Sequence, residues 1–237
     1  MKSIVLSITF LLFISVSLKA QTGINPSVNY YVVEAMDYFR MEQMTKEKLT
    51  KTLTEQDIEG SPYLSDEFSN GTVYTTEKYK VVDVPIRYNI YNDDLEFKTP
   101  EDKIMAVSKP ETIELADFGT FKMSYRNYIT GSKERSGYFK IVEEGNATLL
   151  AKSEVFFQKA EPGDGIKPGK PARFVSKPDM FYISVDKQPA LRINKKNDVY
   201  EALKSHTKGL EAYVKQNKLK LTKEDDLQQL IKYYNSL

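Results

Sequence analysis

Residues 84–91 read Val-Pro-Ile-Arg-Tyr-Asn-Ile-Tyr, and this stretch decides the fold class. Its apolar side chains alternate with the others, which places Val84, Ile86, Tyr88 and Ile90 on one face of an extended chain. A period of two is typical of a β-strand with one buried face. The Asn-Asp-Asp sequence at 92–94 predicts a turn, and residues 95–98 begin a returning strand. The stretch therefore predicts an antiparallel hairpin.

The same pattern continues on the C-terminal side of this hairpin. Short apolar segments bounded by turn residues occupy 103–107, 111–115, 120–125, 138–142, 148–158, 180–186 and 191–194. Turns of two to five residues join antiparallel neighbours, whereas parallel neighbours require crossovers of about a dozen residues. We therefore expect residues 72–194 to form an antiparallel meander, built as a strongly twisted sheet or an open barrel.

Helical patterns flank the meander. Within residues 21–71, the segment 33–44 predicts an N-terminal helix, before a loop that contains Gly-Ser-Pro. Residues 195–237 predict C-terminal helices, and the last of these has the apolar spacing i, i+3, i+4, i+7 at Leu227, Leu230, Ile231 and Tyr234. This stripe is expected to pack on the sheet. The predicted class is α+β, with residues 21–237 forming one domain.

The first 20 residues predict a cleavable signal peptide. Lys2 precedes an apolar run at 4–16, and the small residue Ala20 stands just before Gln21, which marks the expected cleavage position. The run is shorter than the roughly 20 residues that a membrane-spanning helix needs. We therefore expect an exported protein, periplasmic or secreted, with no integral membrane span after cleavage.

Composition excludes several classes of chemistry. The chain has no cysteine and one histidine, so neither a disulfide framework nor a conventional zinc site is expected. Loss of Lys2 and Lys19 with the signal peptide reduces 34 basic residues to 32, against 33 acidic ones. Such a balance gives no long-range attraction to nucleic acid. No metal ion or cofactor is predicted.

No catalytic residue is predicted. His206 would have to be the base of any serine triad, yet its position between two predicted helices favours a helix-end role. The adjacent carboxylates at 66–67, 93–94, 143–144 and 225–226 fall in turns or in the first turn of a helix. The glycine-rich segment 163–171 lacks the spacing of a phosphate-binding loop. An enzyme is therefore not the favoured interpretation.

One candidate ligand-binding face follows from the opening stretch. Opposite its apolar face the strand presents Arg87, Asn89 and Tyr91, whose side chains suit a polar ligand or a partner chain. The alternative is a solvated face with cross-strand hydrogen bonds, and Pro85 suits an edge or a strand start.

Five short motifs, taken in order along the chain, carry a resemblance to a known family. These are Glu-Gly-Ser-Pro-Tyr-Leu at 59–64, Gly-Thr-Val-Tyr at 71–74, the stretch at 84–91, Lys-Pro-Ala-Arg-Phe at 170–174, and Tyr-Tyr-Asn-Ser-Leu at 233–237. With them the mature sequence resembles a family of exported Gram-negative bacterial proteins of about this length, for which no activity is established. The resemblance implies a location in the bacterial envelope and assigns no site residue.

The function that these observations favour is a non-enzymatic binding or interaction module, with an envelope protein or a small molecule as its partner. Two alternatives stay open at this level. One is a hydrolase that uses dispersed carboxylates or a serine, because such sites converge in space and not along the chain. The other is an assembly or scaffolding role in the envelope.

Overall fold

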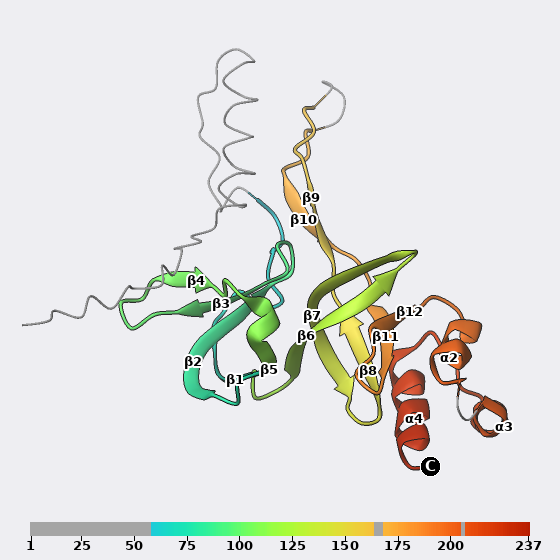
Figure 1. Ribbon diagram of the computed structural model, residues 1–237. Coiled ribbons are helices and arrows are strands. Elements are labelled where there is room, and N and C mark those ends of the chain that lie inside the picture. The colour runs from blue at the N-terminus through green and yellow to red at the C-terminus, as the bar shows by residue number, and fades with distance from the viewer. Residues whose placement is uncertain (1–57, 164–167, 205–206) are drawn as a thin grey trace, which may run out of the picture.

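The computed structural model describes residues 58–163, 168–204 and 207–237. The predicted signal peptide, its cleavage position at Ala20 and Gln21, the predicted helix at 33–44 and His206 lie outside these residues. Within them the chain is mainly antiparallel β-structure followed by three helices (Figure 1), in agreement with the α+β class predicted from the sequence.

The main sheet has ten strands. Its first half, which we call the N-terminal sheet, contains five of them. They are β1 (Ser69–Thr75), β2 (Lys80–Asn89), β3 (Asp94–Lys98), β4 (Ile104–Ala106) and β5 (Ile113–Asp117). Their spatial order is β4-β3-β2-β1-β5, so β5 pairs with β1 and not with β4. The prediction of a simple meander is wrong at this point, because the connection at 107–112 carries the chain across to the far side of β1. A short 3₁₀ helix, η2 (Pro110–Thr112), lies within it.

The next five strands of the sheet close into a barrel. They are β6 (Lys122–Thr130), β7 (Lys133–Glu143), β8 (Ala147–Lys152), β11 (Met180–Val185) and β12 (Ala190–Ile193). Each pairs antiparallel with the next, and β12 pairs back to β6 in parallel. An odd number of strands in up-and-down succession leaves the first and last pointing the same way, so the closing pair has to be parallel. The predicted mainly antiparallel structure is confirmed, but these five strands form a closed barrel where a strongly twisted sheet or an open barrel was expected.

Strand β6 joins the N-terminal sheet to the barrel. Its first residues, Lys122 and Met123, pair with β5, whereas Tyr128 and Ile129 pair with β12 on the same edge. Its other edge pairs with β7 from Lys122 to Thr130. The β6–β7 hairpin is thereby shared, and the two halves of the sheet meet along it.

A two-stranded arm projects from the barrel between β8 and β11. Strands β9 (Val155–Gln158) and β10 (Arg173–Ser176) pair only with each other in the named sheets, and Figure 1 shows them extending away from the barrel. The backbones of Glu161 and Lys170 pair at the far end of the arm, and residues 164–167 of the glycine-rich segment lie outside the described residues. The Glu59 backbone bridges to Arg173 and so attaches the chain before β1 to this arm.

Side chains fill the interior of the barrel. Each barrel strand contributes one buried residue to a single cluster, consisting of Tyr128, Phe139, Leu150, Tyr182 and Ala190. The three rings pack edge to face, with centroids 5.0–5.5 Å apart, an arrangement that the ring quadrupoles favour. The barrel is therefore a packed core and not a lumen for an apolar ligand.

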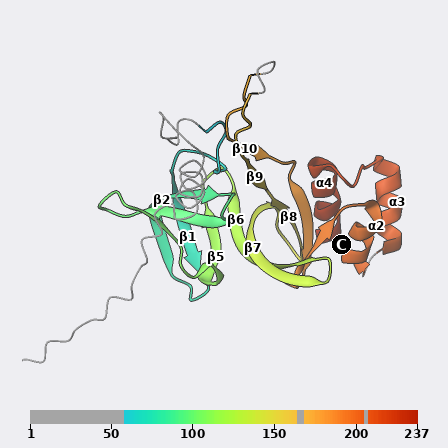
Figure 2. The same ribbon diagram turned by 90° about the horizontal axis from the view of Figure 1, so that it is seen from above.

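Three helices cover the outer face of the barrel: α2 (Lys196–Ala202), α3 (Thr207–Asn217) and α4 (Glu224–Asn235). Figures 1 and 2 place them on the side opposite the N-terminal sheet. The stripe Leu227, Leu230, Ile231 and Tyr234 is buried together with Leu149 and Ile183 of the barrel wall, as predicted. At the end of α4 the Asn235 side chain makes two hydrogen bonds, of 2.8 and 2.9 Å, with the backbone of Ala147 in β8.

Candidate functional site

Two of the three predicted ligand-binding residues meet on one carboxylate. Arg87 Nε and Nη2 donate to Glu96 Oε2 at 2.9 and 2.8 Å, and Asn89 Nδ2 donates to Glu96 Oε1 at 3.0 Å. Arg87 of β2 lies directly opposite Glu96 of β3 in the antiparallel pair, and this register brings their side chains together. Their side chains are only 10% and 6% exposed, and Asn89 is fully buried. This face of the strand is a buried polar network.

Aromatic side chains from the segment before β1 cover this network. The Arg87 guanidinium lies 3.6 Å from the ring centroid of Tyr63 and 4.5 Å from that of Phe68, and its Nη1 donates to the Asp66 carbonyl at 3.1 Å. Tyr91 lies apart and packs edge-on against Phe174 of β10, with centroids 5.4 Å apart. The ligand-binding role of Arg87, Asn89 and Tyr91 stays a prediction, and the contacts show that the first two organise the fold.

The electrostatics of this hairpin predict a pH-dependent stability. Burial raises the pKa of Asp94 to about 6, with further increases from the neighbouring charges of Asp93 and Glu96. The ordinary pKa is about 3.9, so the folded protein holds this proton more tightly than the unfolded chain does. The contribution of Asp94 to the free energy of unfolding therefore rises as the pH falls from about 7 to about 4.

Asp94→Asn is accordingly expected to raise the free energy of unfolding at pH 7.5 by about 1 kcal/mol, a value reduced for solvent screening of this half-buried group. At pH 4 the difference between variant and wild type should be close to zero. Urea denaturation of both proteins at the two pH values measures it. A variant that is less stable than wild type at pH 7.5 would contradict the assignment.

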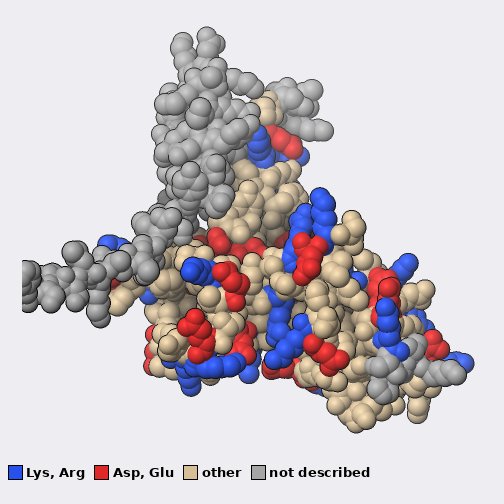
Figure 3. Space-filling view, in the orientation of Figure 1, with Lys and Arg blue, Asp and Glu red and all other residues tan. Residues whose placement is uncertain are grey.

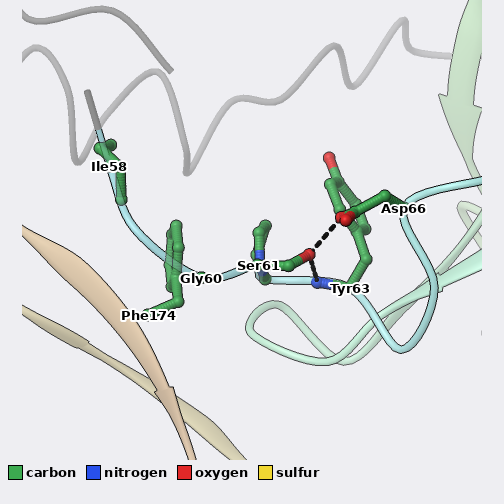
Figure 4. Close-up of a pocket in the computed structure, with 7 residues that line it drawn as sticks. Ile58, Gly60, Ser61, Tyr63, Asp66 and Phe174 are labelled. Atoms are coloured by element: carbon green, nitrogen blue, oxygen red, sulfur yellow. Dashed lines mark hydrogen bonds between the residues drawn. The ribbon is translucent and has the colours of Figure 1, made fainter. Parts of the chain in front are cut away.

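A small pocket lies beside the segment that covers Arg87. It has a volume of about 160 Å³ and is lined by Ile58, Gly60, Ser61, Pro62, Tyr63, Asp66 and Phe174. Figure 4 shows the Ser61 and Asp66 side chains pointing toward one another, with Ser61 Oγ donating to Asp66 and accepting from the Tyr63 N–H at 3.0 Å. The sequence indicated only a turn here. The pocket is smaller than the roughly 300–1,000 Å³ of ordinary ligand sites.

Gly60 allows the covering segment to approach the arm. Its φ is +75°, which favours glycine, and a Cβ at this position would overlap the Phe174 carbonyl oxygen. The Phe174 N–H donates to the Glu59 carbonyl at 2.8 Å, and the Glu59 N–H donates to the Ala172 carbonyl at 3.0 Å. Gly60 and the backbone of Glu59 thus hold this wall of the pocket against the arm.

A larger site lies where the N-terminal sheet meets the barrel, and we call it the seam groove. It consists of two hollows that share Arg126, Glu144 and Lys187. The first has a volume of about 470 Å³, and its remaining lining residues are Gly145, Asn146, Thr148, Ser184 and Asp186. The second has about 350 Å³, and its remaining lining residues are Tyr74, Thr76, Glu111, Ile113, Glu114, Leu115 and Tyr125. Both volumes fall in the range of ligand sites.

Tight turns position the charged residues of the first hollow. Asp186 and Lys187 both have positive φ, 51° and 61°, as the two central residues of a type I′ hairpin turn require. The Gln188 N–H closes this β11–β12 turn on the Val185 carbonyl at 2.9 Å. Glu144 occupies the neighbouring β7–β8 turn, which consists of residues 144–146.

The groove carries charges of both signs, with an excess of carboxylates. Its cations are Arg126 and Lys187, and its acids are Glu111, Glu114, Glu144 and Asp186. Glu114 accepts from Lys78 Nζ at 2.7 Å, and this hydrogen bond and charge lower its pKa. Arg126 Nε donates to Ser124 Oγ at 3.0 Å. Figure 3 shows Lys and Arg side chains interspersed with Asp and Glu side chains over the face of the molecule that is seen in Figure 1.

The sequence did not indicate the seam groove. Its residues come from β1, β5, β6, β8, β11, the short helix η2 and the turns between strands, and they span 113 positions from Tyr74 to Lys187. Each lining residue is of a type that is common at its position in a turn or strand, so none of them indicates a site by itself. Only the arrangement of the two halves around the shared β6–β7 hairpin brings them together.

The described parts of the chain contain neither a metal-binding cluster of side chains nor a helix able to span a membrane. No group of three or more His, Cys, Asp or Glu side chains there is arranged to hold a metal ion. Among the same residues, no helix has the length and apolar character needed to cross a membrane.

Comparisons with known proteins do not place the chain in a family. No family model, curated protein or solved structure matches it.

Proposed function

We propose that this protein is an exported binding module that holds a polar ligand in the seam groove. The observation that carries the proposal is that Arg126 of β6, Glu144 of the β7–β8 turn and Lys187 of the β11–β12 turn line both hollows, whose volumes are 350 and 470 Å³. The packed interior of the barrel gives no support to an apolar ligand. Polar side chains around a concave site supply the orientation and specificity of a ligand complex.

Export is part of the proposal and is supported by the N-terminal sequence. The order of Lys2, the apolar run at 4–16 and Ala20 is that of a secretory signal. The protein recovered from the periplasm or medium of a Gram-negative host should begin near Gln21, as N-terminal sequencing would show. A product that keeps Met1 and sediments with membranes would contradict export.

Arg126→Ala tests the binding site. We expect the mature wild-type protein to retain a polar small molecule through purification, detected by untargeted mass spectrometry of the denatured sample. In the variant the retained amount should fall at least tenfold, because a charge-assisted donor at the junction of both hollows is lost. A tenfold change in affinity corresponds to about 1.4 kcal/mol.

Arg192→Ala is the matched control, because Arg192 is an exposed arginine of β12 that does not line the groove. It should retain the ligand at the wild-type level. Equal retention by both variants would place the ligand elsewhere on the protein and contradict the proposed site.

One observation favours a hydrolase as the second candidate function. Glu111 and Glu144 line the same hollow from different elements, and hydrolysis of a glycosidic bond uses two carboxyls that flank the bond. Product analysis after incubation with a bound ligand separates the two functions, since a binding module returns the ligand intact. A scaffolding role finds support in the projecting arm, on which Phe156 is 42% exposed.

A further inference from the structure

We propose that the ligand of the seam groove is an uncharged, polyhydroxylated chain, an oligosaccharide of more than one sugar unit. This inference rests on the proposed function and adds the chemical class of the ligand. Charge, hydrogen-bonding groups, aromatic surface and length of the groove each support it.

The charges of the groove disfavour ligands with a large charge of either sign. Four carboxylates against two cations repel an oligoanion such as a nucleic acid strand or a polyuronate. An oligocation would be repelled by Arg126 and Lys187 where the two hollows join. In addition, the Glu114 carboxylate is already paired with Lys78, at 2.7 Å. A neutral ligand avoids both conflicts.

The hydrogen-bonding groups suit vicinal hydroxyls. A hydroxyl group donates one hydrogen bond and accepts others, so it fits best between an acceptor and a donor. At the junction the Glu144 carboxylate accepts only, whereas the Arg126 guanidinium and the Lys187 ammonium donate only. Glu144, Lys187 and Asn146 are exposed, and their polar groups are therefore accessible to a ligand.

Two tyrosines give the second hollow its aromatic surface. Tyr74 and Tyr125 are half-buried and lie on β1 and β6. The ring of Tyr125 packs edge-on against the fully buried Tyr138, with centroids 5.1 Å apart, and this contact holds its orientation. A tyrosine ring joins an apolar face to a polar hydroxyl. It can therefore cover the C–H face of a sugar ring while its hydroxyl bonds to the ring's oxygens.

The length of the groove favours a chain over a single ring. The hollows of 470 and 350 Å³ adjoin at three shared lining residues, and each alone is large enough for an ordinary small ligand. A ligand that contacts both Asn146 in the first hollow and Tyr74 in the second must extend past the junction. Affinity is therefore expected to rise from a monosaccharide to a tetrasaccharide.

Isothermal titration calorimetry of the full mature protein tests the class of ligand. The neutral probes are chitotetraose, cellotetraose and maltotetraose with their monosaccharides, and the charged probes are tetragalacturonate and spermine. We expect at least one neutral tetrasaccharide to bind at least tenfold more tightly than its monosaccharide and than either charged probe. Binding of a charged probe alone would overturn the inference.

Variants locate the binding. Tyr74→Ala and Glu144→Gln should each weaken the neutral tetrasaccharide at least fivefold, whereas Tyr79→Ala, a 66% exposed tyrosine outside the groove, should leave its affinity unchanged. Circular dichroism confirms that each variant is folded, and Glu144→Gln keeps the size of an exposed turn residue if Tyr74→Ala is unstable. Equal affinity in all three variants would refute the assigned site.

The experiments distinguish a failure of the oligosaccharide inference from a failure of the proposed groove function. If none of the neutral sugars binds, but the purified protein retains another compound that Arg126→Ala loses, the oligosaccharide inference is wrong and the proposed groove function stands. If no sugar binds and no retained compound depends on Arg126, both are wrong.

Discussion

Leu230→Ala is expected to lower the free energy of unfolding by about 2–5 kcal/mol. Leu230 lies on α4, is fully buried, and belongs to the cluster that joins the helix to Leu149 and Ile183 of the barrel. Truncation removes apolar contacts and leaves a cavity, since the barrel wall and the other helices hold the surrounding side chains in place. Urea denaturation measured against the wild type gives the loss.

Gln229→Ala is the matched control on the same helix. Gln229 is exposed, and its Nε2 donates a 3.2 Å hydrogen bond to the Tyr213 hydroxyl. We expect a change within about 0.5 kcal/mol, as for most surface substitutions. Similar small changes in both variants would mean that α4 is not docked in solution and would make the helix a candidate partner-binding segment.

Lys152→Met is expected to cost about 2–3 kcal/mol, the second large effect. Lys152 Nζ is 2.9 Å from Asp93 Oδ2 and donates to the Tyr138 carbonyl at 3.1 Å. Its side chain is 9% exposed and that of Asp93 is 31% exposed. Removal of the ammonium leaves a partly buried carboxylate without its cation, while methionine keeps most of the packing volume. Chemical denaturation measures the loss.

A double-mutant cycle isolates the ion pair. Asp93→Asn combined with Lys152→Met leaves no unpaired charge, so its loss should be smaller than the sum of the single losses. Lys177→Met is the surface control, because the Lys177–Glu154 pair is half-exposed at both ends and should contribute less than about 1 kcal/mol. Additive losses at Asp93 and Lys152 would show that the two side chains are not coupled.

The Lys152–Asp93 pair also explains a glycine inside a strand. A Cβ on Gly137 would overlap Asp93 Oδ2 and lie 2.7 Å from Lys152 Nζ. Asp93 comes from the β2–β3 turn of the N-terminal sheet, whereas Lys152 and Gly137 belong to the barrel strands β8 and β7. Glycine leaves room for a buried ion pair that crosses between the two halves.

Local patterns predicted the elements well. The alternation predicted at 84–91 lies in β2 as far as Asn89, and the turn predicted at 92–94 lies between β2 and β3 as far as Asp93. The apolar spacing of α4 identified four residues that are all buried. These successes share a cause: a strand or helix with one buried face records that face in its own sequence period.

Longer-range features were missed. Residues 148–158 read as one strand, yet they divide into β8 in the barrel and β9 in the arm, because an apolar run does not show which neighbour it pairs with. The polar face of Arg87 and Asn89 suggested a ligand. In the fold it meets Glu96 and is covered by Tyr63 and Phe68, about 20 residues earlier in the chain.

The sequence by itself determined the antiparallel β class, the C-terminal helices and their buried stripe, because each depends on residues a few positions apart. The tertiary structure alone decided the return of β5 to β1, the parallel closure of β12 on β6 and the seam groove. Strand order depends on which edges remain free once the neighbouring strands have paired. The groove depends on that order in turn, since Tyr74, Arg126 and Lys187 share a surface only after the sheet has curled and closed.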